Sequence, residues 1–189
     1  MTILGVDLSY TGTGLAGWRD TPTGPRLTVA SLSTSADWPR PRRQAAIVAA
    51  AYQRLSALAE NNLVIVENRI ESLRVPGSSL LDLAGLLDVL LYGLYRRRVP
   101  YTLVSNSTLK VYATGSGRAS KLDVVRAWDR RRDADTLPEA DDDNQADALW
   151  LACMAADAYG RPVLALPKTH RRALDSVRWP DWTPDTPGG

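Results

Sequence analysis

The pattern of apolar and polar positions divides the first third of the chain into strands followed by a helix. Short apolar runs between Gly, Thr and Pro turns predict three consecutive strands at residues 2–8, 13–20 and 26–33. Helical periodicity then extends over residues 42–60, and the compact apolar run 63–67 predicts a fourth strand. Consecutive strands joined by such short turns are expected to pair antiparallel.

The rest of the chain alternates helices with one more strand. Residues 79–97, 107–113, 120–132 and 143–159 have helical patterns, and residues 101–104 predict a fifth strand. Three meandering strands followed by helix-strand-helix-strand-helix indicate an α/β protein. The order matches the ribonuclease H-like fold. We therefore expect a five-stranded mixed sheet, with three antiparallel strands followed by two parallel ones, flanked by helices.

Two parts of the chain need a further explanation. The helix 79–97 is apolar over more than one face, so it needs a second burial partner. That partner is either another helix beside the sheet or the same helix in a homodimer. Beyond the predicted domain, residues 1–159, the segment 160–189 contains prolines and tryptophans and little periodicity. It is expected to be a tail that docks locally.

Carboxylates stand at the ends of two apolar strands and at the start of the last helix. Asp7 closes the first strand, Glu67 closes the fourth, and Asp143 and Asp147 lie at the beginning of the helix 143–159. Several carboxylates that meet in one pocket repel each other unless cations neutralise them. Hard oxygen ligands of this kind predict a site for Mg²⁺ or Mn²⁺. The alternative is that the acids near Asp143 only cap the helix.

Charge and composition narrow the classes of function. The formal net charge is only +2, but arginines and lysines are clustered, whereas acids concentrate between Asp133 and Asp147. A basic surface around an acidic pocket suits a polyanion whose cleavage requires metal, although arginine-rich helix ends are also common as solvated faces. The lone Cys153 excludes an intrachain disulfide and fits a reducing cytoplasm. The lone His170 excludes a multi-histidine metal site. Neither a signal peptide nor a membrane span is evident in the sequence.

Four motifs, in order, resemble the RuvC-type Holliday junction resolvases, particularly their phage-encoded relatives. These motifs are Gly5-Val6-Asp7 with Thr11-Gly12-Thr13-Gly14, Val64-Ile65-Val66-Glu67, the loop Lys110 to Lys121 around Gly115-Ser116-Gly117, and Asp147-Ala148-Leu149. Each motif alone is weak evidence, but the ordered set covers roughly residues 2–159. For a phage-encoded member, the expected location is the host cytoplasm.

The resemblance implies a homodimeric, Mg²⁺-dependent endonuclease that acts on branched DNA. It implies that Asp7 bridges two metal ions, with Glu67 and Asp147 as further ligands. It also implies that the basic loop contacts DNA, with the lysines neutralising phosphate and the glycines letting the backbone approach. The predicted DNA-binding residues are Lys110, Gly115, Gly117, Arg118, Lys121, Arg69 and Ile70.

The chain departs from the family pattern at two positions. The family carries an acid or a histidine three residues before the final aspartate, where this chain has Asn144. Asp143 lies four residues before Asp147 and shares its helix face, so we predict Asp143 as the fourth ligand, with Asn144 as the alternative. Ile70 stands where bacterial members place a wedging phenylalanine, and the chain contains no phenylalanine. Strict selectivity for four-way junctions is therefore in question, and forks or flaps are alternative substrates.

Three other interpretations compete with a nuclease. Asp7 and its Gly/Thr turn also fit the phosphate loop of actin-like sugar kinases, but that reading needs a second Asp/Gly/Thr turn, which the sequence lacks. The chain can also be read as a catalytically silent module that binds branched DNA. The third possibility is a dimer scaffold in which the acids are surface caps. That scaffold leaves unexplained why two apolar strands end on carboxylates.

Overall fold

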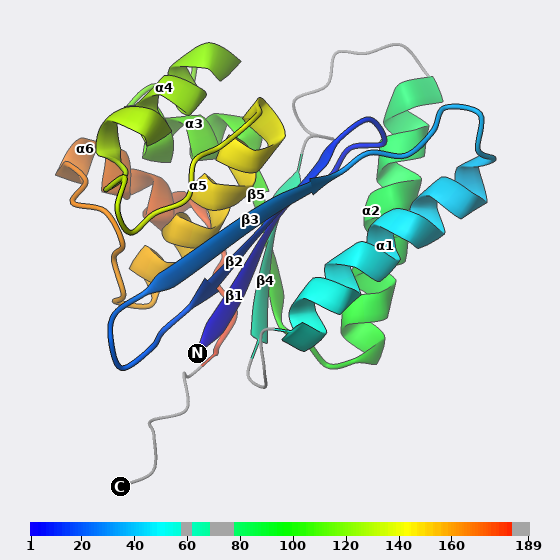
Figure 1. The fold of residues 1–189 in the computed structure, drawn as a ribbon, viewed down its shortest axis with the longest axis horizontal. Coiled ribbons are helices and arrows are strands. Elements are labelled where there is room, and N and C mark those ends of the chain that lie inside the picture. Colours follow the sequence, from blue (N-terminus) through cyan, green and yellow to red (C-terminus); the bar gives the residue numbers. More distant parts are fainter. Residues whose placement is uncertain (58–61, 69–77, 183–189) are drawn as a thin grey trace, which may run out of the picture.

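The computed structural model describes residues 1–57, 62–68 and 78–182, which form a central sheet covered by helices on both faces (Figure 1). The sheet has the order β3-β2-β1-β4-β5. Its strands are β1 (Thr2–Asp7), β2 (Thr13–Arg19), β3 (Arg26–Leu32), β4 (Asn62–Asn68) and β5 (Tyr101–Ser105). β1 pairs antiparallel with β2, as β2 does with β3, whereas β4 runs parallel to both β1 and β5. This confirms the predicted mixed sheet of three antiparallel and two parallel strands.

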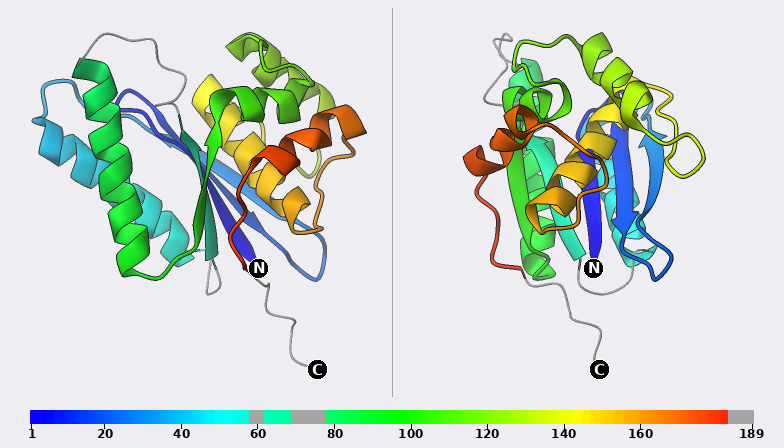
Figure 2. Two further views of the ribbon diagram at one scale, coloured as in Figure 1. Left: turned by 180° about the vertical axis from the view of Figure 1, so that it is seen from behind. Right: turned by 90° about the vertical axis from the view of Figure 1, so that its left-hand side faces the viewer.

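The helices lie in two layers (Figures 1 and 2). The helical elements are α1 (Arg40–Ala57), α2 (Ser78–Arg96), α3 (Asn106–Thr114), α4 (Lys121–Arg131), α5 (Asp143–Ala158), α6 (Lys168–Arg171) and the 3₁₀ helix η2 (Arg172–Ser176). α1 and α2 cover one face of the sheet, while α3, α4 and α5 cover the other. The bounds of α1 to α5 agree with the predicted helices to within about three residues, the usual uncertainty at helix ends.

The alternation of side chains along each strand sorts the core into two halves. In β1, Leu4 and Val6 pack toward α1 and α2, whereas Ile3 packs with α3, α4 and α5. Successive side chains of a strand point to opposite faces, so Gly5 and Asp7 share the face of Ile3. In β4, Ile65 packs toward α5, and the same alternation places Glu67 on that face.

Two glycines allow α5 to lie unusually close to the sheet. A Cβ added to Gly5 would lie 2.3 Å from the carbonyl oxygen of Ala148, and one added to Gly14 would lie 2.0 Å from that of Asn144. No real Cβ tolerates such distances, so only glycine permits this approach. α5 is buried along nearly its whole length, since the sheet lies beneath it and α3, α4 and the C-terminal segment surround it.

The apolar helix α2 packs between the sheet and another helix, which is one of the two burial partners considered from the sequence. Leu86, Leu90 and Leu94 are buried against the sheet and α1. Tyr52 of α1 reaches across to donate a hydrogen bond to the carbonyl of Leu90 at 3.1 Å. A second set of large apolar side chains on α2 remains exposed, namely Leu81, Val89, Tyr92 and Tyr95. Within the described part of the chain, no helix combines the length and the hydropathy needed to cross a bilayer.

The sequence predicts that the segment after Gly160 is a tail that docks locally. In the structure this segment packs onto the domain as far as Trp182, the last described residue. Leu164, Ala173 and Trp182 are buried in the same core as α5. Arg171 clamps the segment to α5, since its Nη2 and Nε lie 2.8 and 3.0 Å from the two carboxylate oxygens of Asp157. The described part of this segment, up to Trp182, therefore contacts the core that α3 and α5 share.

Candidate metal centre

The first two carboxylates of the site come from neighbouring parallel strands. Val6 of β1 stands opposite Val66 of β4, so Asp7 and Glu67 follow side by side at the carboxyl ends of the two strands. Both side chains face α5, because they continue the alternation that points Ile3 and Ile65 to that side. Asp7 is 0% exposed and Glu67 is 2% exposed. Burying two carboxylates so close together is costly unless partners or cations compensate their charge.

α5 contributes the third carboxylate. Asp147 is buried and immediately precedes Ala148, whose carbonyl lies against Gly5 of β1. One carboxylate oxygen from each of Asp7, Glu67 and Asp147 lies within 4.8 Å of the others. The close approach of α5 to β1 and β2 therefore completes the acidic group that the sequence predicted only by resemblance.

Two asparagines donate hydrogen bonds to this group. Asn106, the first residue of α3, donates from Nδ2 to Oε1 of Glu67 at 2.5 Å. With its amide oriented so that the nitrogen faces both acceptors, Asn144 Nδ2 lies 3.1 Å from Oδ2 of Asp7 and 3.1 Å from the carbonyl of Gly12. Carboxylates that bind metals are commonly oriented by such neighbouring donors.

Asn106 was not anticipated from the sequence, because its role depends on how β4 and β5 pair. Glu67 stands opposite Val104, and Asn68 stands opposite Ser105, so the chain leaves β5 beside the glutamate. Ser105 then caps α3 by accepting a hydrogen bond from the amide of Thr108 at 3.1 Å. The only sequence signal is a polar Ser-Asn pair at the end of an apolar strand, which is common in ordinary helix caps.

Asp143, predicted as the fourth ligand, is not in the group of three close carboxylates. Its carboxylate forms an ion pair with Lys121, the first residue of α4. Asp142 is the N-cap of α5 and accepts a hydrogen bond from the amide of Gln145 at 2.7 Å. The structure thus places Asn144, the alternative from the sequence, next to Asp7.

Of the residues predicted to bind DNA, Gly115, Gly117 and Arg118 lie in the turn between α3 and α4, and Lys121 begins α4. Gly115 ends α3 with a positive φ of 83°, which glycine adopts without strain. Arg118 and Lys121 are exposed, and Lys110 is partly buried on α3. Because Lys121 pairs with Asp143 at the start of α5, this turn lies beside the N-terminal end of that helix. Arg69 and Ile70 lie outside the described residues.

His170 of the C-terminal segment packs against the end of α3, where this turn begins. His170 is buried, its Nδ1 lies 3.0 Å from the carbonyl of Tyr112, and its Nε2 would lie 3.0 Å from a Cβ added to Gly115. Tyr112 in turn donates a hydrogen bond to Asp157 at 3.2 Å, and burial raises the pKa of the Tyr112 hydroxyl well above its ordinary value. This contact was not predicted from the sequence, because His170 lies in a segment without periodicity.

The donor set fits a divalent cation. Three buried carboxylates supply hard oxygen atoms at a mutual spacing that one or two ions can bridge. Mg²⁺ and Mn²⁺ prefer such oxygen ligands, whereas zinc sites in proteins are usually built with histidine or cysteine. The group also occupies the carboxyl ends of parallel strands, the edge where α/β sheets commonly bind ligands.

Comparison with known proteins identifies the fold. No family model matches the sequence. RuvC of Thermus thermophilus superposes with a TM-score of 0.67 at 20% identity, covering 87% of this chain and all of that one. The same protein in complex with a Holliday junction substrate gives 0.62 at 23% identity, covering 80% and 90% of the two chains. The yeast mitochondrial Holliday junction resolvase gives 0.51 at 15% identity, covering 79% and 75%. The chain therefore has the RuvC-type resolvase fold, a member of the ribonuclease H-like folds.

Proposed function

We propose that the protein is a metal-dependent endonuclease that cuts Holliday junctions or other branched DNA during recombination, repair or phage DNA processing. The observation that carries this proposal is the buried group of Asp7, Glu67 and Asp147, three carboxylates within 4.8 Å of one another in a resolvase fold. Buried acids in this arrangement lower stability in the absence of a cation, so they are hard to explain as structural residues.

In this proposal the three carboxylates hold Mg²⁺ or Mn²⁺, with two ions per site. Divalent ions bound there would lower the pKa of an attacking water and stabilise the leaving oxygen of a phosphodiester. Asn144 and Asn106 fix the orientation of Asp7 and Glu67 through the hydrogen bonds at 3.1 and 2.5 Å. Asp143 would have to leave its ion pair with Lys121 before it could join the ligands.

The turn between α3 and α4 is the proposed DNA contact. Lys110, Arg118 and Lys121 supply positive charge, and the Gly115 to Gly117 backbone is free of bulky side chains. Charge of this kind binds phosphate without regard to sequence. We expect DNA to compete with Asp143 for Lys121, which would couple binding to the start of α5. That the RuvC neighbour has been solved with a Holliday junction supports this choice of substrate.

A catalytically silent module that binds branched DNA is the alternative function. It shares the basic turn and the fold, so DNA binding alone does not separate the two. Such a module would gain nothing from three buried carboxylates that repel each other. A protein without metal chemistry would be expected to carry neutral residues at these positions. The acidic group therefore favours the nuclease.

Replacing Asp7 by asparagine provides the direct test. Asp7→Asn preserves shape and removes one ligand charge, so we expect it to fold, to bind a labelled four-way junction as well as wild type, and to lose cleavage by about a thousandfold or more. Cleavage in Mg²⁺ or Mn²⁺ is followed on denaturing gels. Asp135→Asn, the same change at an exposed aspartate, is the matched control.

Three outcomes would count against the proposal. Wild type that binds junctions but cuts nothing with either ion would favour the silent module. Full-rate cleavage by Asp7→Asn would remove the proposed site. Equal cleavage of linear duplex and branched DNA would contradict the proposed preference for branched DNA. Comparing the cleavage rates of four-way junctions, forks and flaps measures how selective the protein is for four-way junctions with isoleucine at position 70.

A further inference from the structure

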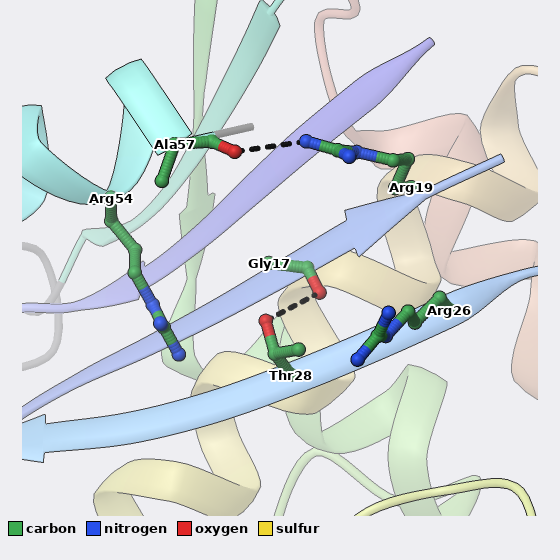
Figure 3. Close-up of a pocket in the computed structure, with 6 residues that line it drawn as sticks. All are labelled: Gly17, Arg19, Arg26, Thr28, Arg54 and Ala57. Atoms are coloured by element: carbon green, nitrogen blue, oxygen red, sulfur yellow. Dashed lines mark hydrogen bonds between the residues drawn. The ribbon is translucent and has the colours of Figure 1, made fainter. Parts of the chain in front are cut away.

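A pocket of about 200 Å³ lies between α1 and the edge of the sheet formed by β2 and β3 (Figure 3). The residues that line it are Gly17, Arg19, Arg26, Thr28, Arg54 and Ala57. Arg19 ends β2, Arg26 begins β3, and Arg54 descends from the last turn of α1. The three guanidinium groups approach the pocket from three different elements.

Strand register separates this pocket from the carboxylate group. Asp7 stands opposite Gly14 in β2, whereas Arg19 lies five residues further along the same strand, about 17 Å at the usual rise. Arg19 and Gly17 share the face of Leu15, which packs toward α1, whereas Asp7 faces α5. The pocket therefore lies on the other face and near the other end of the sheet.

Among the described residues, the lining of the pocket carries three positive charges and no acid. Arg19 and Arg26 stand directly opposite each other in the β2–β3 register, an arrangement in which like charges destabilise a sheet. No carboxylate belongs to the described residues that line the pocket. Arg19 donates to the carbonyl of Ala57 at 2.9 Å, but the end of a helix carries only about half a negative charge against three full positive ones.

Arg54 provides an independent indication of a missing partner. Its Nε is buried and has no hydrogen-bond partner in the described structure. A buried donor without an acceptor costs about 1–3 kcal/mol. Thr28 brings a hydroxyl group to the same space, from the strand position opposite Gly17. The pocket thus offers several donors directed at one site, which suits an anion rich in acceptor atoms.

We propose that this pocket binds a phosphate group. Arginine forks match the paired oxygens of phosphate, and three of them suit a group with two negative charges. A volume of about 200 Å³ accommodates a phosphate or diphosphate and is too small for most complete drug-sized ligands, whose pockets begin near roughly 300 Å³. The phosphate belongs either to a small soluble compound or to the backbone of a DNA arm.

Calorimetric titration of the full chain with pyrophosphate, in EDTA and at constant ionic strength, tests the proposal. Wild type should bind, and Arg26→Gln and Arg54→Gln should each weaken binding about tenfold or more, as expected for loss of a charge-assisted hydrogen bond. Arg54→Lys keeps the positive charge but loses the paired donors of the guanidinium group. Its affinity for pyrophosphate should lie between those of wild type and Arg54→Gln. Arg178→Gln, an exposed arginine outside the pocket, is the matched control and should bind like wild type.

Metal-free binding of duplex DNA across a salt series identifies the source of the phosphate. If pyrophosphate does not bind, but Arg26→Gln and Arg54→Gln weaken DNA binding and reduce its salt slope, the phosphate comes from DNA. If neither ligand responds to the two variants, or Arg178→Gln loses as much affinity, the proposal is wrong. Citrate binding as tightly as pyrophosphate would also overturn it, because the pocket would then select carboxylates. Arg26 is exposed, so its variant remains informative if replacement of Arg54 impairs folding.

Discussion

Among single residues, Asn144 best illustrates how a neutral side chain can adjust an acidic site. Its amide nitrogen lies 3.1 Å from Oδ2 of Asp7, so a carboxylate there would replace a donor with a like charge. We expect Asn144→Asp to lower the melting temperature of the metal-free protein by an amount corresponding to about 1–3 kcal/mol. Mg²⁺ or Mn²⁺ should restore much of this loss, since a fourth carboxylate strengthens cation binding.

Thermal melts in EDTA and in excess Mg²⁺ measure this effect. Asn62→Asp makes the same change at the start of β4, where Asn62 pairs with Thr2 far from the acidic group. Any loss of stability there should not respond to the metal. A metal-independent change in Asn144→Asp would show that the position does not communicate with a cation site.

The residues of the site differ in how far the sequence could predict them. Asp7 and Glu67 close apolar strands, and the analogy with the ribonuclease H-like fold predicts that they meet. Asp143 and Asn144 both follow a helix cap, and one residue of helical rotation decides which faces Asp7. That rotation is set by the contact of the Asn144 carbonyl with Gly14, a backbone contact between distant residues that leaves no pattern in the sequence. Asn106 depends likewise on the register between β4 and β5.

At the scale of elements, the position of α5 depends on two glycines that have no side chain to contribute. We expect Gly14→Ala to destabilise the protein by about 1–3 kcal/mol or more, because the added methyl would clash with backbone at 2.0 Å. The same shift of α5 would move Asp147 and weaken metal binding. Gly85→Ala in α2 is the control, since its nearest neighbours at 3.4 Å are flexible side-chain ends and alanine favours a helix. Denaturant unfolding that ranks Gly14→Ala as stable as wild type would contradict the close contact.

The C-terminal segment that packs against the end of α5 should respond to alkaline pH. Tyr159 donates a hydrogen bond to the carbonyl of Pro180 at 2.7 Å and packs edge-on against Trp179 and Trp182. Burial raises the pKa of Tyr159 to about 12, from an ordinary value of about 10. Because folding favours the protonated hydroxyl, its stabilising effect is complete below about pH 10 and is lost as pH rises through 12.

We therefore expect tryptophan fluorescence to report release of the C-terminal segment between these pH values. Tyr159→Phe retains the ring contacts but has no proton to lose, so its transition should shift to higher pH or merge with global unfolding. Far-UV circular dichroism recorded beside the fluorescence separates local release from loss of the whole fold. An identical fluorescence transition in Tyr159→Phe would assign the pH response to another group.

For the whole molecule, sequence order was enough to predict the layers but not the contacts through which the segment 160–182 docks. Apolar runs of strand length and helices of ordinary length translate directly into the sheet and its covering helices. The segment 160–182 lacks such periodicity, because it is held by isolated anchors such as the Arg171 to Asp157 pair and the packed tryptophans. Contacts of this type between distant residues leave no repeating pattern in a sequence.

Assembly is the remaining question at this scale, and the outer face of α2 provides the means to test it. Leu81, Tyr92 and Tyr95 are 68%, 63% and 73% exposed on one side of that helix, which suits the homodimer expected from the sequence. We expect sedimentation equilibrium to give a dimer for wild type and Tyr92→Asp to weaken it by about thirtyfold or more, as for loss of an aromatic interface anchor. Leu122→Asp, an equally apolar exposed residue on α4, should leave the dimer intact. If the proposed function holds, the Tyr92→Asp monomer should produce single nicks in a four-way junction, whereas a dimer would make paired cuts, because each subunit carries one acidic group. A wild-type monomer at all concentrations, or paired cutting by Tyr92→Asp, would rule out α2 as the dimer interface.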